Sequence, residues 1–171
     1  ATLTIRTAVQ QPQAKEQKMS LEVEEILADS ETEEFAMPSF NHSYICNRLL
    51  QQLFTNDKIE ALPELTLNIE RGMTPDISIY PKEKVVPDFL NDFAKYPDMP
   101  ILAIEIISAS QNIQDLLDKS KVLVNHNVKA VWTIEPFTNT IFVTTPSGIQ
   151  KFPSQTIESE GIKVDFQKIF G

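Results

Sequence analysis

The chain has 171 residues, of which 42% are hydrophobic and 23% charged, a length and composition that suit one domain around a single hydrophobic core. No apolar run approaches the roughly 20 residues that a membrane helix needs, and a net charge of -9 argues against a protein that coats itself with phosphate backbone. Residues 1–38 hold eight acidic and three basic side chains, so the acidity is concentrated at the start of the chain.

Rare residue types exclude several classes of site. Cys46 is the only cysteine, which rules out an internal disulfide, a cysteine-rich zinc site and an iron–sulfur cluster. The two histidines, His42 and His126, lie too far apart for the H-E-x-x-H zinc signature, and the four glycines fit no nucleotide-binding loop. An enzyme of this composition would rely on carboxylates, lysines and an oxygen-ligated metal.

The first 36 residues are predicted to form a polar, acidic arm with a short helix, ahead of a domain over residues 37–171. The arm begins Gln-rich and without periodicity, and Ser20 then stands in cap position before a few apolar residues. No apolar core of a secretory signal occurs in residues 1–20, so we expect a cytoplasmic location.

The next segments show a helix pattern and then a strand pattern. In residues 41–54, Ile45, Leu49 and Leu53 recur every four residues, which predicts a helix with Cys46 beside its apolar face. Residues 65–69 and 77–79 alternate between apolar and polar side chains, which predicts a β-hairpin with a glycine-containing connection.

Residues 81–100 contain four prolines and predict a loop with at most a short helical turn near residues 89–93. Residues 101–107 carry apolar side chains on both faces, as expected of a central strand covered on both sides. Residues 112–125 place their apolar side chains on one stripe of a helix.

The last part of the chain predicts strands over residues 129–134 and 140–144, with residues 149–152 pairing beyond them. In residues 161–170 a strand-like start gives way to a short terminal turn. This order of elements predicts an α/β domain with a central mixed β-sheet flanked by helices.

Glu105 interrupts the most apolar strand of the chain. A buried, ionised carboxylate needs a positive partner, because burial without one is costly. One interpretation is a structural salt bridge to Lys119 or Lys121 of the following helix. The other is a functional site.

Asp76 begins the second strand of the predicted hairpin. Alone, a Pro-Asp dipeptide more often caps a turn. Beside Glu105, it would form a pair of carboxylates that repel each other unless a divalent cation lies between them, and oxygen ligands of this type suit Mg²⁺ or Mn²⁺.

A lysine is the third candidate. Lys119 and Lys121 lie on opposite flanks of the helix's apolar stripe, each about 100° from it, so periodicity does not choose between them. Asp115 stands four residues before Lys119, and an exposed ion pair between these two is the plainer interpretation of that lysine.

Four short segments follow one another along the chain: Thr74-Pro75-Asp76-Ile77-Ser78-Ile79, Ile104-Glu105-Ile106-Ile107-Ser108, Asp115-Leu116-Leu117-Asp118-Lys119 and Val131-Trp132-Thr133-Ile134-Glu135-Pro136. Together they resemble the Uma-two family, which belongs to the PD-(D/E)XK restriction-endonuclease-like superfamily. The resemblance extends from about Met37 to residues 161–170, so it implies a restriction-endonuclease-like fold for that region.

The resemblance makes Asp76 the PD aspartate and Glu105 the second acid. Ile107 stands where the X-K lysine is usual, and the match places the lysine at Lys119 on the next helix. Glu135 stands where an aspartate before proline is usual.

The activity implied by the resemblance is Mg²⁺-dependent (or Mn²⁺-dependent) hydrolysis of phosphodiester bonds, as by an endodeoxyribonuclease. Asp76, Glu105 and the backbone carbonyl of Ile106 would hold the ion, and Lys119 would orient the attacking water or stabilise the transition state. The resemblance implies that the partner is nucleic acid, namely DNA, and that the chain binds no membrane. A homodimer stays open. The alternative is a catalytically silent nucleic-acid-binding or protein-interaction module on the same fold.

The remaining candidates are weaker. We expect His42 and His126 to be polar surface or helix-edge residues, and Trp132 to pack in the sheet rather than stack on a base. Lys82 and Lys84 could touch phosphate, although a solvated loop is their ordinary role.

Overall fold

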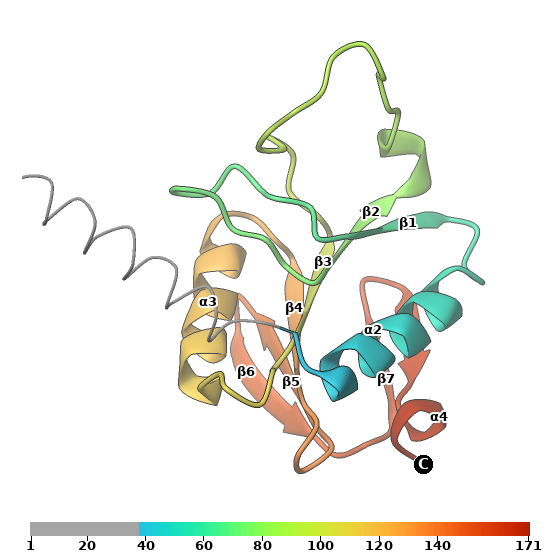
Figure 1. The fold of residues 1–171 in the computed structure, drawn as a ribbon, viewed down its shortest axis with the longest axis vertical. Helices are drawn as coiled ribbons and strands as arrows, with labels where there is room; N and C mark the ends of the chain where they lie inside the picture. The colour runs from blue at the N-terminus through green and yellow to red at the C-terminus, as the bar shows by residue number, and fades with distance from the viewer. Residues whose placement is uncertain (1–37) are drawn as a thin grey trace, which may run out of the picture. The chain divides into compact units, whose positions relative to one another are not determined.

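The computed structural model describes residues 38–171, and its elements are labelled in Figure 1. The predicted arm of residues 1–36, with its short helix, lies outside the described residues. The division of the chain into that arm and a domain over residues 37–171 therefore stays a prediction.

Six strands form one sheet in the order β1-β2-β3-β4-β5-β6. Their bounds are Ile59–Pro63, Ile77–Pro81, Leu102–Ile106, Ala130–Glu135, Thr140–Thr145 and Gly148–Phe152. Neighbours run antiparallel except β3 and β4, which are parallel and are connected through helix α3. The sheet is therefore mixed, as predicted, with β3 buried in its middle.

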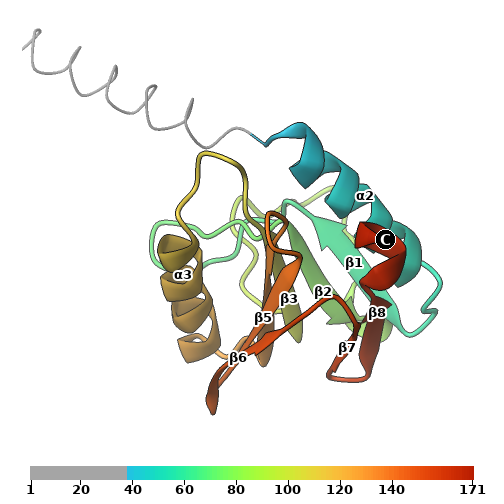
Figure 2. The same ribbon diagram turned by 90° about the horizontal axis from the view of Figure 1, so that it is seen from below.

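Helices cover both faces of this sheet (Figure 2). Helix α2 (Phe40–Leu53), the short helix α4 (Gln167–Phe170) and the hairpin of β7 (Thr156–Ser159) and β8 (Ile162–Asp165) lie on one face, and α3 (Ile113–Asn125) lies on the other. The two faces carry separate apolar clusters. The structure thus has the predicted α/β fold, with a central mixed sheet flanked by helices.

The helix boundaries follow from capping. The Ser39 hydroxyl accepts a hydrogen bond from the backbone N–H of His42 at 3.3 Å, and the Asn112 side-chain carbonyl accepts one from Gln114 at 2.8 Å. Each caps an otherwise unpaired N–H of a first turn. The predicted helices over residues 41–54 and 112–125 are both confirmed.

The predicted hairpin of residues 65–69 and 77–79 is wrong in its first strand. The partner of β2 is β1, five residues ending at Pro63, and residues 64–76 form a loop in which Leu67 makes only isolated bridges. Leu67 and Ile69 are nevertheless buried, since they pack with Leu123 beneath α3. The alternation of apolar and polar residues in this segment therefore reflects which side chains of the loop are buried, and not strand pairing.

The helical turn of the 81–100 loop lies elsewhere than predicted, whereas Trp132 packs as predicted. The turn is a 3-10 helix, η1, at Lys82–Lys84 and not near residues 89–93, and both of its lysines are exposed. Trp132 is fully buried, with its indole N–H donating to the Ser159 hydroxyl at 2.8 Å, so its predicted packing role is confirmed. No helix within residues 38–171 is long and apolar enough to cross a membrane.

Candidate active site

Asp76 and Glu105 meet at one edge of the sheet. Asp76 directly precedes β2, and Ile77 pairs with Ile104 of the antiparallel β3, so Asp76 stands opposite Glu105 near the end of β3. The register of two central strands thus brings together two carboxylates that are distant in sequence.

The Asp76 carboxylate is held on both of its oxygens. Oδ2 accepts a hydrogen bond from the backbone N–H of Ile106 at 2.7 Å, and Oδ1 lies 3.0 Å from Nε2 of His42. The β2–β3 ladder ends at the Ile77–Ile104 pair, and the Ile106 N–H beyond it is bound by this carboxylate. The orientation of Asp76 is therefore fixed by the fold.

Glu105 is buried, with 5% of its surface exposed, on the face of the sheet that α3 covers. Its Oε1 lies 2.5 Å from Nζ of Lys119. Burial raises the pKa of Glu105 to about 7, although the Lys119 ammonium opposes the shift, and the neighbouring Asp76 adds to it. A further positive charge near Glu105 would therefore stabilise its ionised form.

Lys119 is the lysine of α3 that reaches the carboxylates. Besides its ion pair with Glu105, its Nζ lies 3.4 Å from the backbone carbonyl of Thr74, just before Asp76. Lys121 is exposed instead, with its Nζ 3.6 Å from Asp118 on the same helix. The helix wheel does not choose between these two lysines. The packing of α3 does, because the flank that carries Lys119 faces the carboxylates.

His42 is the site residue that the sequence reasoning misplaced. It is buried, not a surface residue, because it continues the apolar stripe of α2 one turn before Ile45. The hydrogen bond to Asp76 raises the pKa of His42 above 6.5, against the opposing effect of burial. Its place on the stripe, three residues before Ile45, is the signal that could have found it.

Asp76 and Glu105 are the groups of this site that could take part in holding a divalent cation. Two carboxylates, Asp76 and Glu105, with the backbone of Ile106 beside them, are oxygen ligands of the kind that Mg²⁺ and Mn²⁺ take, and Mg²⁺ usually keeps several waters. Within residues 38–171 no group of three or more acidic, histidine or cysteine side chains is placed to hold a metal ion. Any ion at this site would therefore need backbone oxygens and water to complete its coordination.

The other candidates lie apart from this cluster. Glu135 accepts hydrogen bonds from the backbone of Phe137 and Thr138 in the turn after β4. His126 is exposed at the end of α3, as expected, and its Nδ1 lies 2.9 Å from the Val122 carbonyl.

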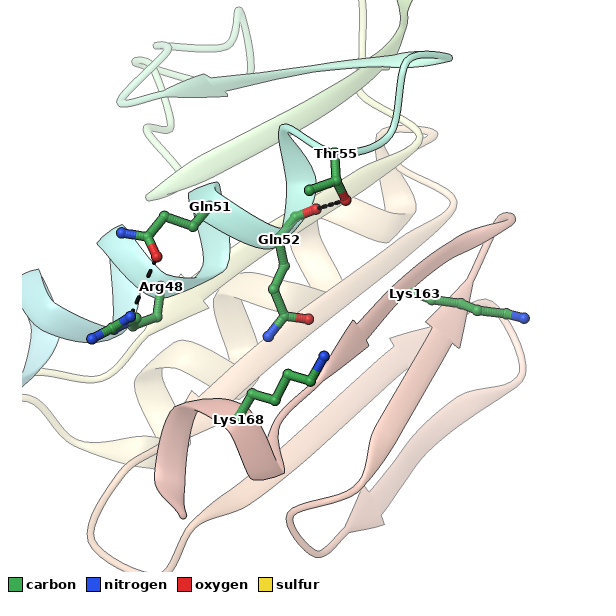
Figure 3. Close-up of a pocket in the computed structure, with 6 residues that line it drawn as sticks. All are labelled: Arg48, Gln51, Gln52, Thr55, Lys163 and Lys168. Atoms are coloured by element: carbon green, nitrogen blue, oxygen red, sulfur yellow. Dashed lines mark hydrogen bonds between the residues drawn. The ribbon is translucent and has the colours of Figure 1, made fainter.

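A separate hollow of about 340 Å³ lies near the C-terminal end of α2, and Figure 3 shows its lining: Arg48, Gln51, Gln52, Thr55, Lys163 and Lys168. The Gln52 amide is locked there by two hydrogen bonds of 2.9 Å to the backbone of Asp165. In Figure 3 the Lys163 side chain points away from Lys168. These cations do not converge, and no carboxylate lines the hollow, so it offers no second metal site.

Comparison with known proteins gives two findings. The model of the Uma2 family, described as "Putative restriction endonuclease", matches residues 10–169. A crystal structure of "a putative nuclease belonging to DUF820 from Anabaena variabilis ATCC 29413" is similar with a TM-score of 0.67 and 20% identity, covering 78% of this chain and 82% of that chain. At this identity the likeness shows the fold alone. No curated protein matches the chain.

Proposed function

The chain belongs to the Uma2 family, and we propose that it is a metal-dependent endonuclease that hydrolyses phosphodiester bonds in DNA. The observation that carries the proposal is the cluster at the sheet edge, in which Lys119 of α3 lies against Glu105, with Asp76 opposite. It supplies two acids and a lysine although Ile107 stands where the superfamily places its lysine.

In the proposed mechanism the chain positions charge around the scissile phosphate. His42 and the Ile106 N–H hold the Asp76 carboxylate, so that it does not have to be ordered at each turnover. Asp76, Glu105 and the Ile106 carbonyl are the groups that would hold Mg²⁺ or Mn²⁺. When bound, the ion would supply Lewis acidity and lower the pKa of a water ligand.

Lys119 has two roles in this proposal. In the ion-free protein it partly neutralises Glu105, which burial would otherwise leave as an uncompensated negative charge. Its side chain is 28% exposed, so with substrate present its ammonium would also face the negative charge that grows on the phosphate oxygens. A fixed cation at that position stabilises the transition state more than the ground state.

Cleavage of supercoiled plasmid and of circular single-stranded DNA, each with Mg²⁺ or Mn²⁺, tests the proposal. We expect cleavage by the wild type, loss of cleavage in Glu105→Ala, and unchanged cleavage in Glu158→Ala. Glu158 is a matched control because its carboxylate is half-exposed and pairs with Lys163 in the β7–β8 hairpin. If the wild type binds DNA but neither ion supports cleavage, the chain is a binding module on a nuclease fold and the proposed activity is wrong.

A further inference from the structure

A hollow of about 380 Å³ adjoins the candidate active site, and its volume is in the range of ligand pockets. Residues before His42, the loop after β3 and the β4–β5 turn enclose it, and its lining includes Ser39, Asn41, Ser108, Gln111 and Phe137. The hollow is next to the candidate active site because Asn41 precedes His42, and Ile107 follows Ile106, whose N–H binds Asp76. In Figure 1 the three segments lie at the end of the sheet where α2 begins.

Phe137 stands at the rim of this hollow with 97% of its surface exposed. Single exposed apolar residues are common on proteins. This aromatic differs because it lies in a turn whose backbone is fixed, next to polar groups and near a candidate catalytic centre.

Glu135 fixes the turn. Its Oε1 accepts the backbone N–H of Phe137 at 2.8 Å, and its Oε2 accepts the N–H of Thr138 at 2.9 Å and also the Thr138 hydroxyl. Burial alone would raise the pKa of Glu135, but these hydrogen bonds outweigh burial and lower it. The carboxylate is thus occupied by the turn, and the backbone that carries Phe137 is held in place.

The lining around Phe137 combines two kinds of group. Ser39, Asn41 and Gln111 carry hydroxyl and amide donors and acceptors, and the Oε1 of Gln111 is anchored by the Ser108 N–H at 2.9 Å. An exposed aromatic face beside such groups matches the chemistry of an unpaired nucleobase, which offers a π-face for stacking and an edge for hydrogen bonds. A base within a duplex offers neither, because its faces are covered by its neighbours.

We propose that Phe137 stacks on an unpaired base next to the phosphate that faces Lys119, so that the substrate is single-stranded or locally unpaired DNA. This inference rests on the proposed function for the position of the phosphate. Phe137 is then a substrate-positioning residue, and Glu135 positions Phe137.

The test measures binding in chelator, so that it does not depend on turnover. The probes are a short single-stranded DNA of mixed sequence, the same sequence as a duplex, and an abasic strand that keeps the phosphates, each end-labelled for fluorescence anisotropy. We expect Phe137→Ala to weaken binding of the single strand roughly 5- to 150-fold, the range of one base–aromatic stack, and to leave duplex and abasic binding unchanged. Phe137→Trp should restore the affinity, and the introduced indole should be quenched by the single strand only.

Phe89→Ala is the matched control, because Phe89 is 95% exposed and lines a different hollow in the loop between β2 and β3. The inference is overturned if Phe137→Ala behaves like Phe89→Ala, if it weakens duplex and single strand equally, or if the wild type does not bind the single strand. A protein that binds the single strand through Phe137 but never cleaves DNA supports this inference and overturns only the proposed function.

Discussion

The ammonium of Lys119 on α3 lies 2.5 Å from the carboxylate of Glu105 on β3, so a helix supplies the cation beside this buried acid. Lys119 approaches Glu105 from the face of the sheet that α3 covers, the face on which Ala103 packs with Leu123. The position of the charge therefore depends on how α3 packs, as well as on the strand itself.

Lys119→Ala is expected to abolish cleavage, whereas Lys121→Ala should weaken it by less than about tenfold. Only a group near the scissile phosphate stabilises the transition state selectively, and Lys121 pairs with Asp118 on the exposed side of α3. Initial rates of plasmid cleavage under identical metal concentrations measure both effects. Equal losses in the two variants would show that the lysine is assigned wrongly.

Part of this site could be predicted from the sequence. A carboxylate inside an apolar strand is a local signal, and it pointed to Glu105. The order of the four short motifs between residues 74 and 136 indicated the fold through family resemblance. The choice of Lys119 over Lys121 came from family resemblance. Both lysines flank the same stripe, and which flank faces the sheet edge is set by tertiary packing.

His42 and strand β1 could not be placed by the same reasoning, for different reasons. His42 lies on the buried stripe of α2, but a histidine there reads equally well as a polar helix end until Asp76 is known to lie beside it. Strand β1 is short and ends in Pro63, whereas the stronger alternation of residues 65–69 arises from a loop buried under α3. The alternating pattern predicts a strand at residues 65–69, whereas contacts with distant parts of the chain bury these residues as a loop.

His42→Ala should reduce cleavage roughly 10- to 100-fold, the range expected for losing a hydrogen bond to a charged group. The variant leaves one oxygen of Asp76 without its partner, so the concentration of Mg²⁺ that gives half-maximal rate should rise as well. His126→Ala is the control, since His126 is exposed at the end of α3 and should be silent in both measurements. A lower rate with an unchanged Mg²⁺ requirement would mean that His42 does not act through Asp76.

The ion-free protein should lose stability as pH rises, and Glu105 should account for a definable share. The pKa of Glu105 is about 7 in the folded state, against 4.5 for an ordinary glutamate. Between these pH values the folded state therefore binds more protons than the unfolded state. The stability that Glu105 contributes below pH 4.5 is lost as pH rises through 7. Glu105→Gln removes this titration. Urea unfolding in chelator at several pH values measures the effect. Between pH 4.5 and 8 the free energy of unfolding of the variant should rise relative to that of the wild type by on the order of 3 kcal/mol. The hydrogen bond to Asp76, the largest cause of the raised His42 pKa, is present in both proteins, although Glu105→Gln removes the smaller contribution of the Glu105 charge. A difference that does not change with pH would contradict the assigned shift.

Mn²⁺ should stabilise the wild type without any substrate. An ion that binds only the folded state at a hundred times its dissociation constant adds about 2.7 kcal/mol to the free energy of unfolding, which for a chain of this size raises the unfolding midpoint by roughly 5 to 10 °C. Glu105→Gln should lose most of this response, because it removes one of the two carboxylates that would hold the ion. Thermal melts of both proteins, in chelator and in saturating Mn²⁺, make the comparison.

Lys119→Ala separates ion binding from a purely structural role of the Glu105–Lys119 pair. If Glu105 is an ion ligand, then Lys119 competes with the ion for the same carboxylate, and Lys119→Ala should keep the Mn²⁺ response in full or increase it while losing cleavage. If the pair exists only to support the fold, removing either partner costs about 3 to 5 kcal/mol in chelator, and neither variant nor wild type responds to Mn²⁺. The two alternatives therefore predict opposite results from one set of melts. A wild type indifferent to Mn²⁺, together with strong destabilisation in both variants, would overturn the metal site, because Glu105 would then be a structural partner of Lys119 and nothing more.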